Sequence, residues 1–144
     1  MKRAAAVFRR PPAEYALLAE ALAALTLASI AIKLLPFRKV AAAASAWGSQ
    51  ASRDDARSVR RARSAVLAWA RRVPWRAVCF QRGLALHLML RRRGIPSVLN
   101  YGVARKEGEG LAAHVWIDVG DETVIGGDEA PKFARVARFP AEAA

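Results

Sequence analysis

The chain has 144 residues, of which 54% are apolar, and a formal net charge of +12. This length and apolar content are typical of one compact domain, residues 1–144, with a core of its own. The single cysteine excludes an internal disulfide and a cysteine-based zinc site, so we expect a reducing, cytoplasmic setting.

The positive charge is unevenly distributed. Residues 1–106 carry 21 Lys or Arg against four acidic residues, and residues 107–144 carry three against eight. The first part therefore has a charge of +17 and the second a charge of −5. An excess of positive charge is common in proteins that bind nucleic acids or acidic membranes, but here it is confined to one region.

The apolar stretch from Tyr15 to Leu35 is predicted to form the first helix. Pro11-Pro12-Ala13-Glu14 is typical of a helix start, and Pro36 ends the pattern. Its unbroken run of apolar or small residues, Ala21–Ile32, has 12 residues, whereas a membrane-spanning helix needs about 20. We therefore expect no membrane span and no signal peptide, but a helix that packs on the protein or lies peripherally on a membrane.

Two further segments precede the single cysteine. Ala41 to Ser52 is small and polar and is predicted to be a connector, whereas Asp54 to Arg72 is predicted to be a second helix. Asp54 and Asp55 in the first turn and arginines in the last match the helix dipole. The other arginines of this helix, including Arg63, are interpreted as a solvated face.

A third helix is predicted to begin at about Cys79. Apolar residues cover most of its circumference, which indicates a helix buried on nearly all sides. Arg91–Arg93 occupy its last turn, and Gly94 and Pro96 end it. No Ser, Thr, Asp or Asn precedes Cys79 to cap the start, so backbone N–H groups there are free to bind an anion.

The pattern then changes to strands, which predicts an α+β fold. Ser97–Ala104, Leu111–Val119 and Thr123–Ile125 are expected to be strands, and the last two to form a hairpin. Within the second strand His114, Trp116 and Asp118 share the face opposite to the apolar one. Trp116 on that face could wall a binding site or belong to the core.

Cys79 and His114 together have the chemistry of a thiol nucleophile with its base. A helix start and a nearby imidazole both favour the thiolate. The alternative is that a lone cysteine is a small buried apolar residue. The other histidine, His87, lies eight residues beyond Cys79, about 12 Å along the helix, and is interpreted as structural or partly exposed.

Hairpin register predicts the third member of such a site. A three-residue loop pairs Val119 with Thr123 and places His114 opposite Asp128, about 5 Å away. Asp118 shares the strand of His114 but lies about 13 Å from it. Glu129 replaces Asp128 if the loop has two residues or a bulge intervenes.

Several motifs resemble the transglutaminase-like leader peptidases of lasso-peptide biosynthesis, over about residues 15 to 140. They are Cys79-Phe-Gln-Arg-Gly-Leu-Ala-Leu-His-Leu-Met-Leu-Arg-Arg-Arg-Gly-Ile-Pro, Tyr101-Gly-Val, Ala113-His-Val-Trp-Ile-Asp, Val124-Ile-Gly-Gly-Asp-Glu and Arg138-Phe-Pro. The resemblance implies a papain- or transglutaminase-like fold, in which N-terminal helices (residues 1–50, with the connector) precede a catalytic core (residues 51–144). Its nucleophile helix would pack centrally on a small antiparallel sheet.

The resemblance also implies an activity. Cys79, His114 and Asp128 would form the triad of a cysteine peptidase that needs no metal or cofactor, although some members of the family place the aspartate nearer Gly126. The enzyme would cut the leader from a ribosomally made precursor peptide. A separate leader-recognition protein would bind the leader, and an ATP-dependent lasso cyclase would close the macrolactam ring.

Two alternatives come from other classes of protein. The arginines of the second helix and Arg91–Arg93 are compatible with a small basic nucleic-acid-binding protein, but no recognition motif is visible, so we expect no nucleic acid. A non-catalytic scaffold of a biosynthetic complex would make Cys79 incidental.

Overall fold

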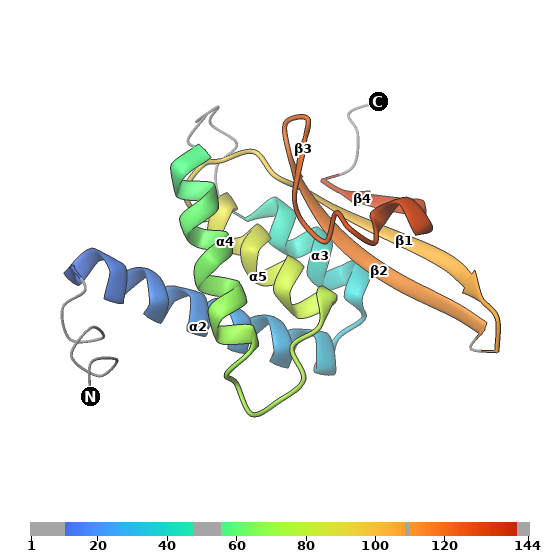
Figure 1. Cartoon of the computed structure of the whole chain (residues 1–144), viewed down its shortest axis with the longest axis horizontal. Coiled ribbons are helices and arrows are strands. Elements are labelled where there is room, and N and C mark those ends of the chain that lie inside the picture. The colour runs from blue at the N-terminus through green and yellow to red at the C-terminus, as the bar shows by residue number, and fades with distance from the viewer. Residues whose placement is uncertain (1–10, 48–55, 109, 141–144) are drawn as a thin grey trace.

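The structure is a computed structural model that describes residues 11–47, 56–108 and 110–140. In Figure 1 the helices gather on one side of a four-stranded antiparallel sheet of order β3-β2-β1-β4, which confirms the expected α+β fold. The elements are α2 (Pro12–Leu34), α3 (Phe37–Ala46), α4 (Ala56–Ala70), α5 (Cys79–Arg92), β1 (Val98–Lys106), β2 (Gly110–Val119), β3 (Glu122–Ile125), the 3₁₀ turn η1 (Ala130–Lys132) and β4 (Ala134–Phe139).

The predicted connector is wrong in its first half, because α3 continues through it to Ala46. Alanine has the highest helix propensity, and the four consecutive alanines 41–44 extend the helix. Val40, Ala41 and Ala44 are buried, so tertiary packing adds to this preference. Residues 48–52 of the connector, and the predicted first turn with Asp54 and Asp55, lie outside the described residues.

Helix α2 matches its prediction and packs on α4 and α5. Trp69 donates its indole N–H to the Leu18 carbonyl at 2.8 Å, and Trp75 donates to Ser29 Oγ at 2.9 Å. By length and composition α2 is also the one described helix long and apolar enough to cross a membrane. One of its sides is nevertheless occupied by protein.

Helix α5 lies at the centre of the fold, between the other helices and the sheet, as predicted (Figure 1). Gly83 allows it to approach β2 closely, because a Cβ at this position would lie 2.7 Å from Val115 Cγ1. Its buried apolar residues are Leu84, Ala85, Leu86, Met89 and Leu90.

The arginines that end α5 hold it to its neighbours. Arg92 and Arg93 both form ion pairs with Glu20 of α2, at 2.7 and 2.5 Å. Arg91 is buried and donates to the backbone carbonyls of Ser45 and Trp47. All three side chains therefore have partners within the protein, which weakens their value as a nucleic-acid surface.

The β2–β3 hairpin differs from its predicted register. Val119 pairs with Glu122, so the loop has two residues instead of the expected three. A bulge then inserts one residue, and Ile117 pairs with Ile125 as the predicted register requires. The two deviations cancel, but β3 ends at Ile125, so the ladder does not continue to His114 and Asp128.

Candidate active site

Cys79 is the first residue of α5 and is half-buried. The preceding residue, Val78, is extended and has no side chain that could cap the helix. Gln81 accepts a hydrogen bond from the Val78 N–H at 3.1 Å, which fixes the entry of the chain into the helix. As predicted, no side chain caps the first N–H groups of α5. The backbone of Cys79 and Phe80 donates hydrogen bonds to the thiol.

Aromatic packing holds this helix start in place. The Phe80 ring lies edge-on to Phe37 of α3, with centroids 4.9 Å apart, and 6.0 Å from Tyr101 of β1. One helical turn after Cys79, Gly83 brings α5 onto β2. These contacts place the thiol against the backbone of β2.

The surroundings of Cys79 have opposite effects on the pKa of its thiol. Burial raises the pKa of Cys79 above its ordinary value, because a thiolate loses hydration there. Backbone hydrogen bonds from Val115 and Phe80 and the charge of Arg82 oppose this rise. Burial prevails, so the neutral thiol is favoured, contrary to the expectation from the helix start alone.

His114 is buried on β2 and has its ring fixed by one hydrogen bond. Its Nε2 lies 2.8 Å from the carbonyl oxygen of Gly126. A carbonyl oxygen only accepts, so Nε2 carries the proton and donates it. In the neutral ring the lone pair is then on Nδ1, which can accept a proton.

The imidazole also stacks against two aromatic rings. Phe133 lies 5.0 Å from it and Trp116 5.9 Å, centroid to centroid, with interplanar angles of 29° and 21°. Trp116 is buried and is not among the residues that line the cavity described below. Its contact with a substrate stays a prediction.

Gly126 has a left-handed backbone conformation that favours glycine, with φ of +80°. A Cβ there would lie 2.7 Å from the Val115 carbonyl oxygen and 3.1 Å from His114 Nε2. Gly126 thus brings its carbonyl to the imidazole at a position too crowded for a side chain.

Cys79, His114 and Asp128 line one cavity of about 240 Å³. The cavity lies where α4, the start of α5, β2 and the end of β3 meet. Its other lining residues are Arg63, Leu67, Arg82, Val115, Ile125, Gly126 and Glu129. The three predicted catalytic residues are therefore brought to one place from three separate segments.

The carboxylates around this cavity have different environments. Asp128 and Glu129 are exposed at its rim, and among the described residues no hydrogen bond joins either of them to His114. Asp118 instead accepts hydrogen bonds from Thr123 Oγ1 at 2.6 Å and Asn100 Nδ2 at 3.0 Å. Asp118 is thus held away from the site, and the role of Asp128 stays a prediction.

His87 is a structural residue inside the helical core. It is fully buried, and its two ring nitrogens lie 2.9 Å from Ser45 Oγ and 2.8 Å from Ser97 Oγ. Burial, aided by the charge of Arg91, lowers its pKa to about 3, so the ring is neutral. It is structural as expected, but it has no exposed part.

Two residues of the site were not predicted from the sequence. Arg63 was interpreted as part of a solvated face, but its Nε donates to the Val124 carbonyl at 2.6 Å and its side chain lines the cavity. Arg82 donates to the Ala77 carbonyl at 2.8 Å and faces the thiol. The spacing of three between Cys79 and Arg82 on one helix could have indicated the second.

In the described part of the chain no group of three His, Cys, Asp or Glu side chains could hold a metal ion.

The sequence matches a known protein family. Residues 5–138 match the family described as the transglutaminase-like superfamily. No curated protein and no solved structure matches the chain.

Proposed function

Since the chain belongs to the transglutaminase-like superfamily, which includes cysteine proteases, we propose that it is a cysteine peptidase that removes the leader from a lasso-peptide precursor. The observation that carries this proposal is that Cys79 and His114 line the same cavity. The hydrogen bond from His114 to Gly126 leaves Nδ1 as the proton acceptor for the thiol.

The first half of the reaction forms a thioester. Nδ1 of His114 accepts the thiol proton as the Cys79 sulfur attacks the scissile carbonyl carbon. The uncapped N–H groups at the start of α5 stabilise the negative charge that develops on the carbonyl oxygen. The imidazolium then gives its proton to the leaving amine, and the carbon–nitrogen bond breaks.

The second half returns the enzyme to its starting state. His114 accepts a proton from water, and the hydroxide oxygen attacks the thioester carbon. The leader departs as a carboxylic acid, and the Cys79 sulfur recovers its proton from the imidazolium. Asp128, at the rim of the cavity, stabilises the imidazolium by its charge.

The leader specificity rests on the sequence resemblance and on the chemistry expected of a lasso pathway. We expect this chain to act with a separate leader-recognition protein and an ATP-dependent lasso cyclase in the cytoplasm. Hydrolysis of the leader is then its own step, and ring closure belongs to the cyclase.

Reconstitution with a lasso-peptide precursor tests this function. Mass spectrometry should show slow leader release by the chain alone and faster release when the leader-recognition protein is added. Full-rate release without that protein would contradict the proposed partnership. Absence of release under both conditions, with salt-sensitive binding to generic DNA, would favour the nucleic-acid alternative instead.

A further inference from the structure

A stripe of apolar side chains runs along the outer side of α2. Its large members are Tyr15, Leu27, Ile30 and Leu34, with exposed fractions of 39, 59, 52 and 73%. They follow the spacing of one helix face, and the exposed residues between Tyr15 and Leu27 on the same face are alanines. A helix that is apolar on all sides normally has both of its faces covered.

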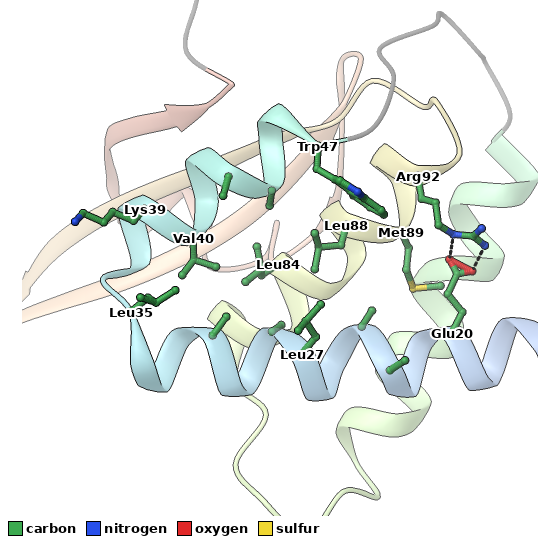
Figure 2. Close-up of a pocket in the computed structure, with 16 residues that line it drawn as sticks. Glu20, Leu27, Leu35, Lys39, Val40, Trp47, Leu84, Leu88, Met89 and Arg92 are labelled. Atoms are coloured by element: carbon green, nitrogen blue, oxygen red, sulfur yellow. Dashed lines mark hydrogen bonds and ion pairs between the residues drawn. The ribbon is translucent and has the colours of Figure 1, made fainter.

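A groove of about 790 Å³ lies beside this stripe. Figure 2 shows it between α2 and α3, with Leu84, Leu88 and Met89 of α5 on its floor. Leu27 and Leu35 line one side, and Trp47, which is 47% exposed, lies near one end. The stripe and the groove form one apolar surface, far larger than single exposed residues would produce.

The charges along this surface are basic. Lys33, Arg38 and Lys39 are exposed around the turn from α2 to α3. Glu20, which also lines the groove, already forms ion pairs with Arg92 and Arg93. An apolar surface with basic residues at its border matches the acyl chains and phosphate groups of an anionic bilayer.

We propose that α2 and α3 dock this protein onto an anionic phospholipid membrane, with an acyl chain in the groove. The stripe would lie among the acyl chains, and Lys33, Arg38 and Lys39 would contact lipid phosphates. Trp47 would lie at the interface, where tryptophan is enriched.

Packing of the opposite side of α2 makes this contact peripheral. Ala21, Leu25 and Ala28 are completely buried against the protein, so α2 cannot enter a bilayer as a separate spanning helix while the fold is intact. A second copy of the chain is a poorer occupant, because each copy carries a net charge of +12 and the same basic border.

Vesicle sedimentation tests the proposal with the whole chain. The wild type should sediment with vesicles of phosphatidylcholine and phosphatidylglycerol and much less with phosphatidylcholine alone. Raising the salt from about 0.1 to 1 M, which shortens the Debye length from roughly 10 to 3 Å, should weaken the binding.

Two triple variants separate the contribution of the apolar side chains to membrane binding from that of the basic side chains. Leu27→Gln with Ile30→Gln and Leu34→Gln should weaken binding at least roughly tenfold. Lys33→Gln with Arg38→Gln and Lys39→Gln should weaken binding to the anionic vesicles by roughly fivefold per charge.

The matched control places the same change on the sheet. Leu111→Gln with Val136→Gln removes two exposed apolar side chains from the β-strands and should bind as the wild type does. Circular dichroism must show an unchanged fold for every variant. Absence of vesicle binding by the wild type, or equal binding by all variants, overturns the proposal. A dimer that the α2 variant dissociates, without vesicle binding, would assign the surface to a second copy.

Discussion

His114 donates its Nε2–H to the backbone carbonyl of Gly126, 2.8 Å away, so a main-chain oxygen orients the histidine in this site. A carboxylate more often has this position in catalytic triads. The carbonyl fixes the same tautomer without a negative charge. The orientation of the base therefore depends on the backbone conformation of the segment after β3.

Replacement of Gly126 by alanine tests this dependence. The new Cβ would clash with the Val115 carbonyl and crowd His114 Nε2, so turnover should fall roughly tenfold to a hundredfold. Gly108→Ala is the matched control, because Gly108 has the same φ of +80° but no atom within 4 Å of an added Cβ. It should cost about 1–2 kcal/mol of stability and leave turnover unchanged. Equal loss of turnover in both variants would contradict the role of the carbonyl.

The single thiol allows its reactivity to be measured without a substrate. Because burial raises the pKa of Cys79, the rate of iodoacetamide alkylation of the wild type should still be rising at pH 9.0, the ordinary value for a cysteine. His114→Ala should slow alkylation at neutral pH, whereas His87→Gln should not. A wild-type rate that is already constant at pH 7 would instead show a stable thiolate–imidazolium pair.

Replacement of Asp128 and replacement of Asp118 are expected to have different effects on turnover and stability. Asp128 lies at the cavity without a bond to the imidazole, so Asp128→Asn should lower turnover about tenfold, less than the loss of about 10⁴ known for a directly bonded triad carboxylate. Asp118→Asn should keep turnover within a few fold and lower stability, because Thr123 and Asn100 lose their acceptor. Steady-state kinetics measure the turnover of both variants, and urea denaturation measures their stability. The reverse ranking would show that Asp118, and not Asp128, supports His114 in turnover.

His87 should make the fold sensitive to acid. Its pKa is about 3 in the folded protein and 6.5 in the reference state, so the unfolded chain binds the proton first. The stability is complete above pH 6.5 and is lost as the pH falls toward 3. Between pH 7 and pH 5 the free energy of unfolding should fall by about 2 kcal/mol. Urea denaturation of His87→Gln should show a smaller fall over this interval, and an unchanged fall would contradict the argument.

The sequence predicted most of the helical architecture because its boundaries depend on local signals. Pro36 after α2, and Gly94 with Pro96 after α5, end their helices whatever surrounds them. The alanine-rich α3 was not predicted because a run of alanines shows no alternation of apolar and polar residues. The burial of this helix is a tertiary effect. The chain nevertheless provided enough information to place Cys79 at a helix start beside the strand of His114.

The finer geometry of the site could not be predicted, because it depends on irregular backbone. The two-residue hairpin loop and the bulge each shift the register by one residue, and no local residue preference determines both. The positive φ of Gly126 then turns its carbonyl toward His114. Arg63 reaches the cavity only because α4 packs beside β3.

Leader release by the Cys79→Ala variant tests the central claim most directly. The precursor, the leader-recognition protein and the wild-type enzyme should give free leader, and acid-quenched enzyme should carry the leader as a thioester on Cys79. Cys79→Ala should give neither product, with an unchanged melting temperature. Normal leader release by Cys79→Ala would contradict the account, because the nucleophile would then lie elsewhere.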